Sequence, residues 1–400
     1  MNITIISNNY YPEDSGIGLY STGMAEFLVK NHKVKVISAM PYYPQWEIYS
    51  EYKNKSKFYS ETINNVEVLR FKQYTPKKPT FVKRIFQMCH FFIGSIINVF
   101  KIKKNDVVIV VMPFTISIIL GKMVTLFKGG KLLVHVQDFE FDAAFETGLS
   151  KKNGLIARLI FHLERVLLNR ADSISTISFG MLKKLETKTS SSTSYFPNWI
   201  DYSKINPETA KPNKLFDTNK FNILYSGNIG AKQDWDFFID FVIKCQEINK
   251  VQVYLIGDGA KREEVVEKIK NLSNCTYFPP VRYEELNDLL CNADLHILFQ
   301  KSSIVDIVMP SKILGMMASG KPSIVTGHEE SEVKHNFEIS DGGFYYFGVD
   351  KMDQILQNIK NLVKNKGVSE KIGKQAREFV IKNYSMESVL GQFQKLIEKY

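Results

Sequence analysis

Cysteine is scarce in this sequence and forms no pattern. The 400 residues contain four cysteines, without a CxxC pair or an accompanying histidine cluster: Cys89, Cys245, Cys275 and Cys291. This pattern indicates neither a disulfide framework nor a structural zinc site, and it suits a reducing cytoplasm.

Long apolar runs are also missing. No run reaches the roughly 18–20 residues that a membrane-spanning helix needs. The first residues enter an apolar strand at once (Asn2 to Ile6), which leaves no room for a cleavable signal. We therefore expect a cytoplasmic protein that is soluble or bound peripherally to the inner face of the plasma membrane.

Acidic residues are absent from one stretch of the first half. Residues 72–104 carry eight Lys and Arg and no Asp or Glu. Residues 1–200 hold 26 basic against 15 acidic residues, whereas residues 201–400 hold 26 against 27, so the whole net charge of +10 arises in the first half. This asymmetry indicates that the two halves meet different partners.

Short apolar strands alternate with helix-length amphipathic segments along the whole chain, which is typical of parallel βαβ units. We predict strands at 3–6, 34–38, 66–71, 107–111, 132–136, 173–177, 194–196, 222–225, 251–256, 275–278, 295–299 and 323–325. The predicted fold is α/β, with two Rossmann-like, doubly wound domains facing across a cleft. Their predicted bounds are 1–200, a polar linker at 201–220, 221–383, and a closing helix at 384–400 that crosses back to the first domain.

Glycine-bearing loops follow several predicted strands. Gly16 and Gly18 stand between the first strand and the first helix, where glycine allows a ligand to approach the backbone. A dinucleotide fingerprint is disfavoured, because the loop is long and Ser21 occupies the place of the third glycine. Ordinary turn chemistry is the alternative for this loop.

Three further loops lie in the second half. Gly227, Asn228 and Lys232 come before a helix and form a candidate diphosphate cradle. Gly257 begins a second glycine turn with cations behind it. The third loop reads Pro310-Ser311-Lys312, in which Ser311 is a good N-cap whose helix would direct free N–H groups at an anion.

The order of these motifs resembles the retaining glycosyltransferase family 4, whose fold is GT-B. The motifs are YSGNIG with a following Lys, IGDGAKR, Y-x-E-L with NADL, and PSK with MASGKP. The opening NNYYPEDSGIGLYSTGMAEFL, with PYYP and HVQDFEFDAA, resembles a branch that builds bacterial polysaccharides. That branch includes colanic-acid and N-acetyl-L-fucosamine transferases, and the resemblance covers essentially the whole chain.

The resemblance implies a role for each matching residue. Gly16 and Gly18 would approach the donor from the first domain, and Lys232 would neutralise the leaving β-phosphate. The segment Pro310-Ser311-Lys312 would hold the diphosphate on a helix N-terminus. The loop around Arg282, with Gly257, would lie near the nucleoside.

Two departures from the family pattern stand out. The two glutamates of the family fall here on Ile307 and Gly315, and Asp306 is the carboxylate that we take as the contact to the transferred sugar. The family's His-Asp pair reads Gln137-Asp138, so we take His135 and Asp138 as catalytic candidates. A hydrogen-bonded core histidine is the alternative for His135, and a loop cap is the alternative for Asp138 and Glu140.

The acid-free segment 72–104, which we call the basic belt, brackets an aromatic and apolar helix at 81–100. Such a helix can lie in the interface of an anionic bilayer. A buried helix with a solvated edge is the alternative. Nucleic acid is disfavoured, because the aromatic residues follow helical spacing and no nucleic-acid module is present.

The sequence thus predicts a retaining glycosyltransferase for capsule, O-antigen or exopolysaccharide synthesis. We expect a UDP-sugar donor rather than a GDP-sugar, with N-acetyl-L-fucosamine or another deoxy sugar transferred without a metal or other cofactor. The expected acceptor is an undecaprenyl-diphosphate-linked saccharide. A GT-B sugar-nucleotide epimerase and a non-catalytic nucleotide-sugar-binding assembly subunit remain as alternatives.

Overall fold

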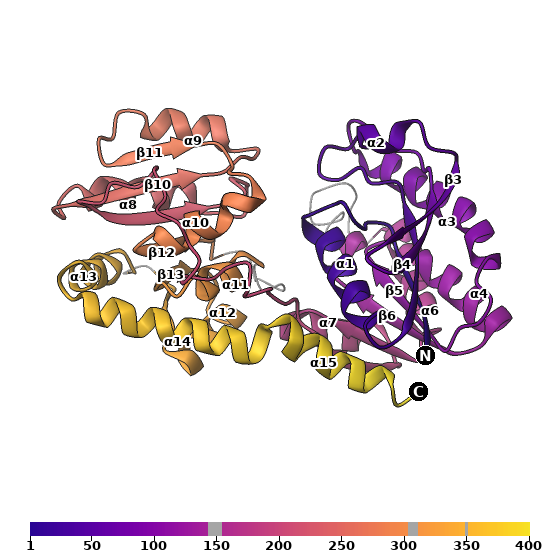
Figure 1. Cartoon of the computed structure of the whole chain (residues 1–400). Helices are drawn as coiled ribbons and strands as arrows, with labels where there is room; N and C mark the ends of the chain where they lie inside the picture. The colour runs from indigo at the N-terminus through magenta and orange to yellow at the C-terminus, as the bar shows by residue number, and fades with distance from the viewer. Residues whose placement is uncertain (143–153, 303–310, 349–350) are drawn as a thin grey trace. The chain divides into compact units, whose positions relative to one another are not determined.

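The structure is a computed structural model that describes residues 1–142, 154–302, 311–348 and 351–400. The chain divides into two compact units (Figure 1). Unit 1 comprises Met1–Pro197 and Leu390–Tyr400, and unit 2 comprises Asn198–Val389.

Unit 1 is built on an eight-stranded sheet with the order β3-β4-β2-β1-β5-β6-β7-β8. Its strands are β1 (Asn2–Ser7), β2 (Lys33–Ala39), β3 (Phe58–Ile63), β4 (Val66–Phe71), β5 (Val107–Met112), β6 (Lys131–Val136), β7 (Ser173–Thr176) and β8 (Ser192–Tyr195). All neighbours pair in parallel except β3 and β4. The central strand β5 is apolar and buried at every position, as a parallel strand covered on both faces requires.

Helices flank this sheet (Figure 1). They are α1 (Gly16–Leu28), α2 (Ser50–Lys53), α3 (Phe81–Phe100), α4 (Ser117–Lys128), α6 (Leu155–Leu168) and α7 (Phe179–Lys188). The chain winds from β1 through β2 to β4 on one side and from β5 through β6 to β7 on the other. The winding direction therefore reverses between β1 and β5, where doubly wound sheets bind ligands.

Unit 2 repeats this plan with a six-stranded parallel sheet in the order β11-β10-β9-β12-β13-β14. Its strands are β9 (Phe221–Ser226), β10 (Val251–Ile256), β11 (Cys275–Phe278), β12 (Leu295–Phe299), β13 (Ser323–Thr326) and β14 (Phe344–Tyr346). The winding direction reverses between β9 and β12, so the loops after these two strands diverge there.

The helices of unit 2 surround one continuous apolar core. They are α8 (Trp235–Cys245), α9 (Arg262–Ile269), the 3₁₀ turn η1 (Tyr283–Glu285), α10 (Leu286–Asn292), α11 (Ser311–Ala318), α12 (Glu332–Ser340), α13 (Lys351–Lys364) and α14 (Lys366–Tyr384). The long helix α14 runs along one side of the unit and contacts α11, α12 and α13 (Figure 1).

The structure confirms an α/β fold, and it contains every strand that the sequence predicts. It adds β3 and β14 at the edges of the two sheets, with the short helix α2 and helix α12. The antiparallel β3 makes the first sheet mixed. Asn64 and Asn65, with φ of 47° and 67°, form the two-residue turn that joins β3 to β4.

The polar segment 201–220, predicted as a linker, packs within unit 2. Ile205 and Phe216 are buried, and the Phe216 ring meets Tyr254 at 4.9 Å. Arg377 of α14 donates to the Ile205 carbonyl over 2.7 Å. The boundary between the units therefore falls at Pro197 and Asn198.

The final helix, α15 (Met386–Ile397), begins in unit 2 and ends in unit 1. In unit 1 the Phe393 ring stacks on Phe196 at 4.2 Å, and Glu398 lies 3.2 Å from His32. These contacts show how the last eleven residues join the first unit.

Candidate functional site

The carboxyl end of the sheet in unit 2 gathers the glycine loops. The loop after β9 contains Gly227, and the loop after β10 contains Gly257 and Gly259. All three have a positive φ that L side chains rarely adopt, between 134° and 156°. Because β9 and β10 are neighbours, these loops meet.

The loops pack so closely that no side chain fits between them. A Cβ atom on Gly257 would lie 1.9 Å from the Gly227 carbonyl oxygen, and one on Gly259 would lie 2.4 Å from Asn228 Oδ1. A Cβ atom on Gly227 would lie 2.8 Å from Lys312 Nζ. The glycines thus bring the backbone of two loops and the ammonium of Lys312 together.

Lys312 stands in the first turn of α11. Its Nζ lies 4.7 Å from the centre of the Tyr225 ring and donates to Tyr225 Oη over 3.2 Å. Burial lowers the pKa of Lys312 to about 8. Among the described residues no carboxylate lies within ion-pair distance of it.

A largely buried ammonium without an acidic partner is costly, and a helix N-terminus adds positive potential beside it. Both features favour a bound anion. A diphosphate would supply two negative groups and accept hydrogen bonds from N–H groups of the first turn.

Lys232, the other predicted phosphate cation, is placed differently. It stands in the turn between β9 and α8, and its side chain is exposed. Its carbonyl accepts from the Lys301 N–H over 3.1 Å, which ties the turn to the loop after β12. The structure thus places Lys232 on the same loop as Gly227, although its ammonium is solvated.

The predicted nucleoside side contains Gly257 and Arg282. Gly257 donates to the Phe278 carbonyl (3.2 Å) and accepts from Tyr277 Oη (3.2 Å). Arg282 begins η1 after β11, is exposed, and pairs with Glu285 over 3.1 Å. Arg282 therefore lies in the loop after β11, the strand next to β10, and its guanidinium pairs with a carboxylate of its own turn.

Some predicted residues cannot be placed. Asp306 and Pro310 lie outside the described residues. Ser311 is the first residue of α11, and only its backbone is described.

The carboxyl end of the sheet in unit 1 is organised around a buried carboxylate that the sequence analysis did not single out. Glu13 accepts from the N–H groups of Tyr42 (2.7 Å) and Tyr43 (2.9 Å) and from Asn9 Nδ2 (2.8 Å). A Cβ atom on Gly18 would lie 2.7 Å from Glu13 Cβ. Position 18 therefore has no room for a side chain beside Glu13.

Gly16 has a different role in this loop. It begins α1 with a φ of 57°, and a Cβ atom on it would lie 3.8 Å from the Tyr43 ring. Its left-handed backbone, rather than crowding, explains the glycine.

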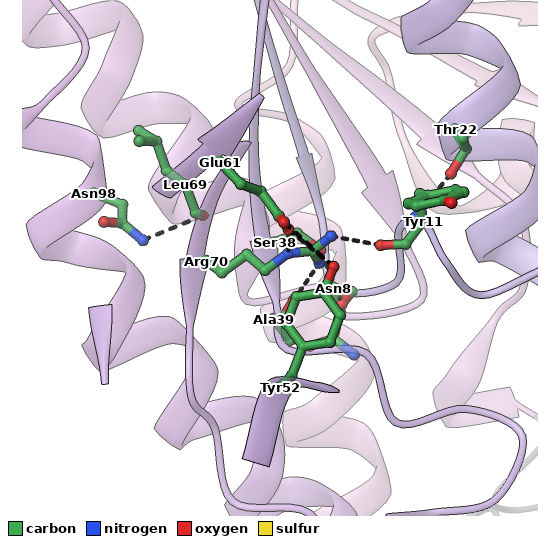
Figure 2. Close-up of polar contacts among 10 residues, drawn as sticks. All are labelled: Asn8, Tyr11, Thr22, Ser38, Ala39, Tyr52, Glu61, Leu69, Arg70 and Asn98. Atoms are coloured by element: carbon green, nitrogen blue, oxygen red, sulfur yellow. Dashed lines mark hydrogen bonds and ion pairs between the residues drawn. The ribbon is translucent and has the colours of Figure 1, made fainter. Parts of the chain in front are cut away.

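Arg70 on β4 fixes the same loop (Figure 2). Its guanidinium is fully buried and bonds Glu61, the Ala39 carbonyl (3.0 Å) and the Tyr11 carbonyl. The Tyr52 ring lies 5.0 Å from it. In the sequence, the single cation of the apolar run VEVLRF is the feature that could have identified Arg70, because a buried charge requires several partners.

His135 lies inside unit 1 rather than at an open surface. Gln137 Nε2 donates to its Nε2 (2.9 Å), so Nδ1 carries the proton and faces Ser175 Oγ at 3.0 Å. Burial lowers its pKa to about 3, so the imidazole is neutral. This geometry fits the alternative of a hydrogen-bonded core histidine. Asp138, in contrast, is exposed beyond the end of β6.

Glu140, two residues after Asp138, is buried and lies 2.6 Å from Arg84 of α3. Burial raises the pKa of Glu140 to about 7 against the opposing effect of Arg84. Arg84 also lies 5.6 Å from the Trp46 ring. This ion pair thus connects the first turn of α3 to the loop that carries Asp138.

The sequence model of the glycosyl transferases group 1 matches residues 220–365, the part of unit 2 that contains the Lys312 site. A protein of Escherichia coli K12, assigned to colanic acid biosynthesis as the glycosyl transferase WcaI, is 30% identical over 409 residues. The match covers 98% of this chain and 98% of that protein. The chain belongs to the group 1 glycosyltransferases.

Solved structures show the same fold at low identity. Sucrose-phosphate synthase of Thermosynechococcus elongatus superposes with a TM-score of 0.74 at 13% identity, over 100% of this chain and 98% of that one. HepE of Anabaena in complex with UDP gives 0.69 at 14%, over 100% of both chains. WaaG, a glycosyltransferase involved in lipopolysaccharide biosynthesis, gives 0.67 at 12%, over 99% of both. The two units of this glycosyltransferase thus form a GT-B fold.

In this glycosyltransferase Gly315 occupies the position of the family's second glutamate. Gly315 is buried in α11, and a Cβ atom there would lie 3.3 Å from Leu290 Cδ1 of α10. A carboxylate at this position would point at an apolar side chain.

The basic belt contains a helix that is only half buried. α3 spans Phe81–Phe100, as predicted, and buries Met88, Phe91 and Val99. Its exposed apolar side chains are Val82, Phe86, Ile93, Ile97 and Phe100. The belt therefore combines a buried helix face with an exposed apolar stripe, and cations lie at both ends of the helix. No helix in the described ranges is long and apolar enough to cross a membrane.

Proposed function

We propose that this glycosyltransferase moves a sugar from a nucleoside diphosphate sugar to a lipid-linked saccharide, with retention, in the synthesis of a bacterial surface polysaccharide. The observation that carries this proposal is the Lys312 ammonium beside Gly227 without an acidic partner among the described residues. The likeness to a colanic acid enzyme supports the polysaccharide class.

The chemistry follows from the charge that develops during transfer. The bond between the anomeric carbon and the β-phosphate oxygen breaks, and the acceptor hydroxyl oxygen bonds that carbon as the hydroxyl proton passes to the departing phosphate. Negative charge grows on the departing diphosphate, where Lys312 and the N–H groups of α11 would stabilise it. Lys232 would add a solvated charge at the rim, and no metal would be required.

The donor we favour is a UDP-sugar over a GDP-sugar. HepE, which shares the fold, has been crystallised with UDP and with UDP-glucose. N-acetyl-L-fucosamine or another deoxy sugar is the transferred group that we propose. Asp306 is the proposed contact to that sugar.

The proposed acceptor saccharide is neutral, and polar atoms at the carboxyl end of the sheet in unit 1 suit it. Buried side-chain atoms without a hydrogen-bond partner among the described residues occur on four of its loops: Ser15 Oγ, both amide atoms of Gln73, Thr115 Oγ1 and Glu140 Oε2. Buried polar atoms of this kind are costly unless water or a ligand hydroxyl pairs with them. Sugar hydroxyls can both donate and accept there.

The lipid of the acceptor would remain in the inner leaflet of the plasma membrane. An undecaprenyl diphosphate carrier is the class that we propose. The basic belt, with its exposed apolar stripe on α3, would hold the enzyme at this anionic surface.

The test is turnover of radiolabelled UDP- and GDP-sugars by the purified chain, with and without a membrane lipid extract. Label should pass from the UDP-sugar into lipid only when the extract is present, and Lys312→Met should abolish transfer. Conversion of the free donor to another sugar nucleotide would instead identify an epimerase. Donor binding without either reaction would identify an assembly subunit.

A further inference from the structure

Unit 1 contains a pocket that the proposed reaction does not use. It has a volume of about 420 Å³ and opens between α6 and α7. Its lining residues are Asp142, Phe161, His162, Arg165, Lys184, Thr187 and Lys188. Four of these seven side chains can carry positive charge, so the pocket is suited to an anion.

Two lysines of α7 are fixed in this pocket by buried carboxylates. Lys184 lies 2.8 Å from Asp142 Oδ1, and Lys188 lies 2.8 Å from Asp142 Oδ2. Lys188 also pairs with Glu164. Hydrogen bonds from the two lysines hold the pKa of Asp142 low although burial opposes them.

Two aromatic rings also contact Lys188. Its Nζ lies 4.6 Å from the Phe161 ring and 5.3 Å from the Phe139 ring. A lysine held by two carboxylates and two rings has lost its rotamer freedom before any ligand arrives, which favours binding.

The rim of the pocket carries the charge that remains unbalanced. Arg165 is exposed, and no ion pair among the described residues includes it. Within the described ranges the carboxylates paired with Lys184 and Lys188 are Asp142 and Glu164, so three cations stand against two acidic groups. An anion bound at the rim would neutralise the remaining positive charge.

An exposed apolar stripe borders this rim. Leu159, Leu163 and Val166 of α6 are exposed at 59%, 51% and 37%, and their spacing places them on one face of the helix. His162, which lines the pocket, comes three residues after Leu159 and four before Val166, so the pocket borders the stripe along α6. Helix α6 packs against α4, which exposes Leu126 and Phe127 in turn.

We infer that the pocket between α6 and α7 binds the phosphate of a membrane lipid, with the apolar stripe of α6 against its hydrocarbon. Phosphate matches the unbalanced charge, and hydrocarbon matches exposed leucine and valine beside it. A free phosphate would leave the stripe in water. This site is separate from the basic belt, so the inference goes beyond the proposed function.

The probe is dihexanoyl phosphatidic acid, kept below the concentration at which it forms micelles, with inorganic phosphate as the comparison. Calorimetry should show that the wild type binds the lipid at least fivefold more tightly than phosphate. Leu163→Ser should remove most of this difference. Equal affinity for the two probes, or no binding of the lipid, would overturn the inference.

Arg165→Gln and Arg158→Gln form a matched pair on the same helix, since both arginines are exposed and only Arg165 lines the pocket. Arg165→Gln should weaken lipid binding about fivefold, the effect expected of one basic group. Arg158→Gln should change it less than twofold. Equal effects of the two variants would show general charge attraction and overturn the inference.

Both arginine side chains are exposed, so unfolding temperatures of the variants should match the wild type and verify folding. Turnover with a water-soluble acceptor should also be unchanged in Arg165→Gln. Absence of turnover in every form, with lipid binding intact, would refute the proposed reaction and leave the lipid site standing.

Discussion

Replacing Lys312 by methionine should make the protein more stable and at the same time inactive. Methionine keeps an unbranched side chain beside Tyr225 and removes the charge. The folded state then no longer holds a poorly solvated ammonium, whereas the donor loses its buried cation.

The pKa of Lys312 sets the size of the stability gain. Burial lowers it from 10.5 to about 8. Each pKa unit corresponds to about 1.4 kcal/mol, so the charged lysine destabilises the fold by about 3 kcal/mol. The variant loses the contacts to Tyr225, worth about 1 kcal/mol together. A net gain of about 2 kcal/mol should raise the melting temperature of unit 2 by about 4 to 8 °C.

The gain has a definite dependence on pH. Because the folded pKa lies below that of the unfolded chain, the unfolded state binds more protons between about pH 8 and 10.5. The wild type therefore recovers stability as the pH rises through this range. The advantage of the variant should be full below pH 8 and should shrink towards pH 10.5.

Scanning calorimetry of both forms at pH 7 and pH 10 measures this advantage, and titration with UDP measures binding. Lys312→Met should bind UDP at least tenfold more weakly, because a charged hydrogen bond is worth about 1.5–3 kcal/mol. Lys232→Met is the control: its exposed side chain should change stability by no more than about 0.5 kcal/mol while still lowering turnover. Unchanged stability at pH 7 together with wild-type UDP affinity would refute the reasoning.

Three further predictions concern other parts of the molecule. Burial raises the pKa of Glu140 from 4.5 to about 7. The stability of the wild type relative to Glu140→Gln should therefore be highest below pH 4.5 and fall by up to about 3 kcal/mol by pH 7. A stability difference in urea unfolding that does not change with pH would contradict this. Turnover should survive EDTA, and restoration by Mg²⁺ after a loss would contradict metal-free transfer. Replacing Lys101, Lys103 and Lys104 by glutamine should weaken flotation with anionic vesicles by on the order of 3 kcal/mol at low salt, and high salt should mimic it. Unchanged flotation would exclude the belt from membrane contact.

The central strands could be predicted because burial on both faces requires an apolar run. β5 is such a run, and central strands of this kind can be recognised without knowing which strands they pair with. β3 and β14 could not be predicted in the same way. They lie at sheet edges, with alternating or very short sequences, so pairing with β4 or β13 defines them.

The glycine positions in unit 2 could also be predicted, because a tight strand-to-helix turn needs residues without Cβ. The relative burial of Lys232 and Lys312 could not. Both lysines follow a glycine or proline loop in the sequence, and only the approach of α11 to Gly227 separates them. That approach depends on the packing of α11 in the core of unit 2.

The ion pairs of unit 1 could not be predicted from the sequence for a related reason. Arg70 and Glu61 are diagonal neighbours across the β3–β4 pair, so they become partners only once β3 is recognised. Arg84 and Glu140 are 56 positions apart and meet only in the folded sheet. For His135, the sequence left a catalytic residue and a core histidine open, because burial depends on the strands and loops packed around β6.

The two sheets differ in whether the cations at their carboxyl ends are paired with carboxylates, and this difference bears on where each substrate binds. In unit 1 two cations at this end are paired with carboxylates: Arg70 with Glu61, and Arg84 with Glu140. In unit 2 the corresponding end holds Lys312 without a described acidic partner, next to a helix N-terminus. An anion relieves the second arrangement and would disturb the first, where buried carboxylates repel it. Charge therefore favours the diphosphate donor in unit 2 and a neutral saccharide in unit 1, independently of any likeness to known enzymes.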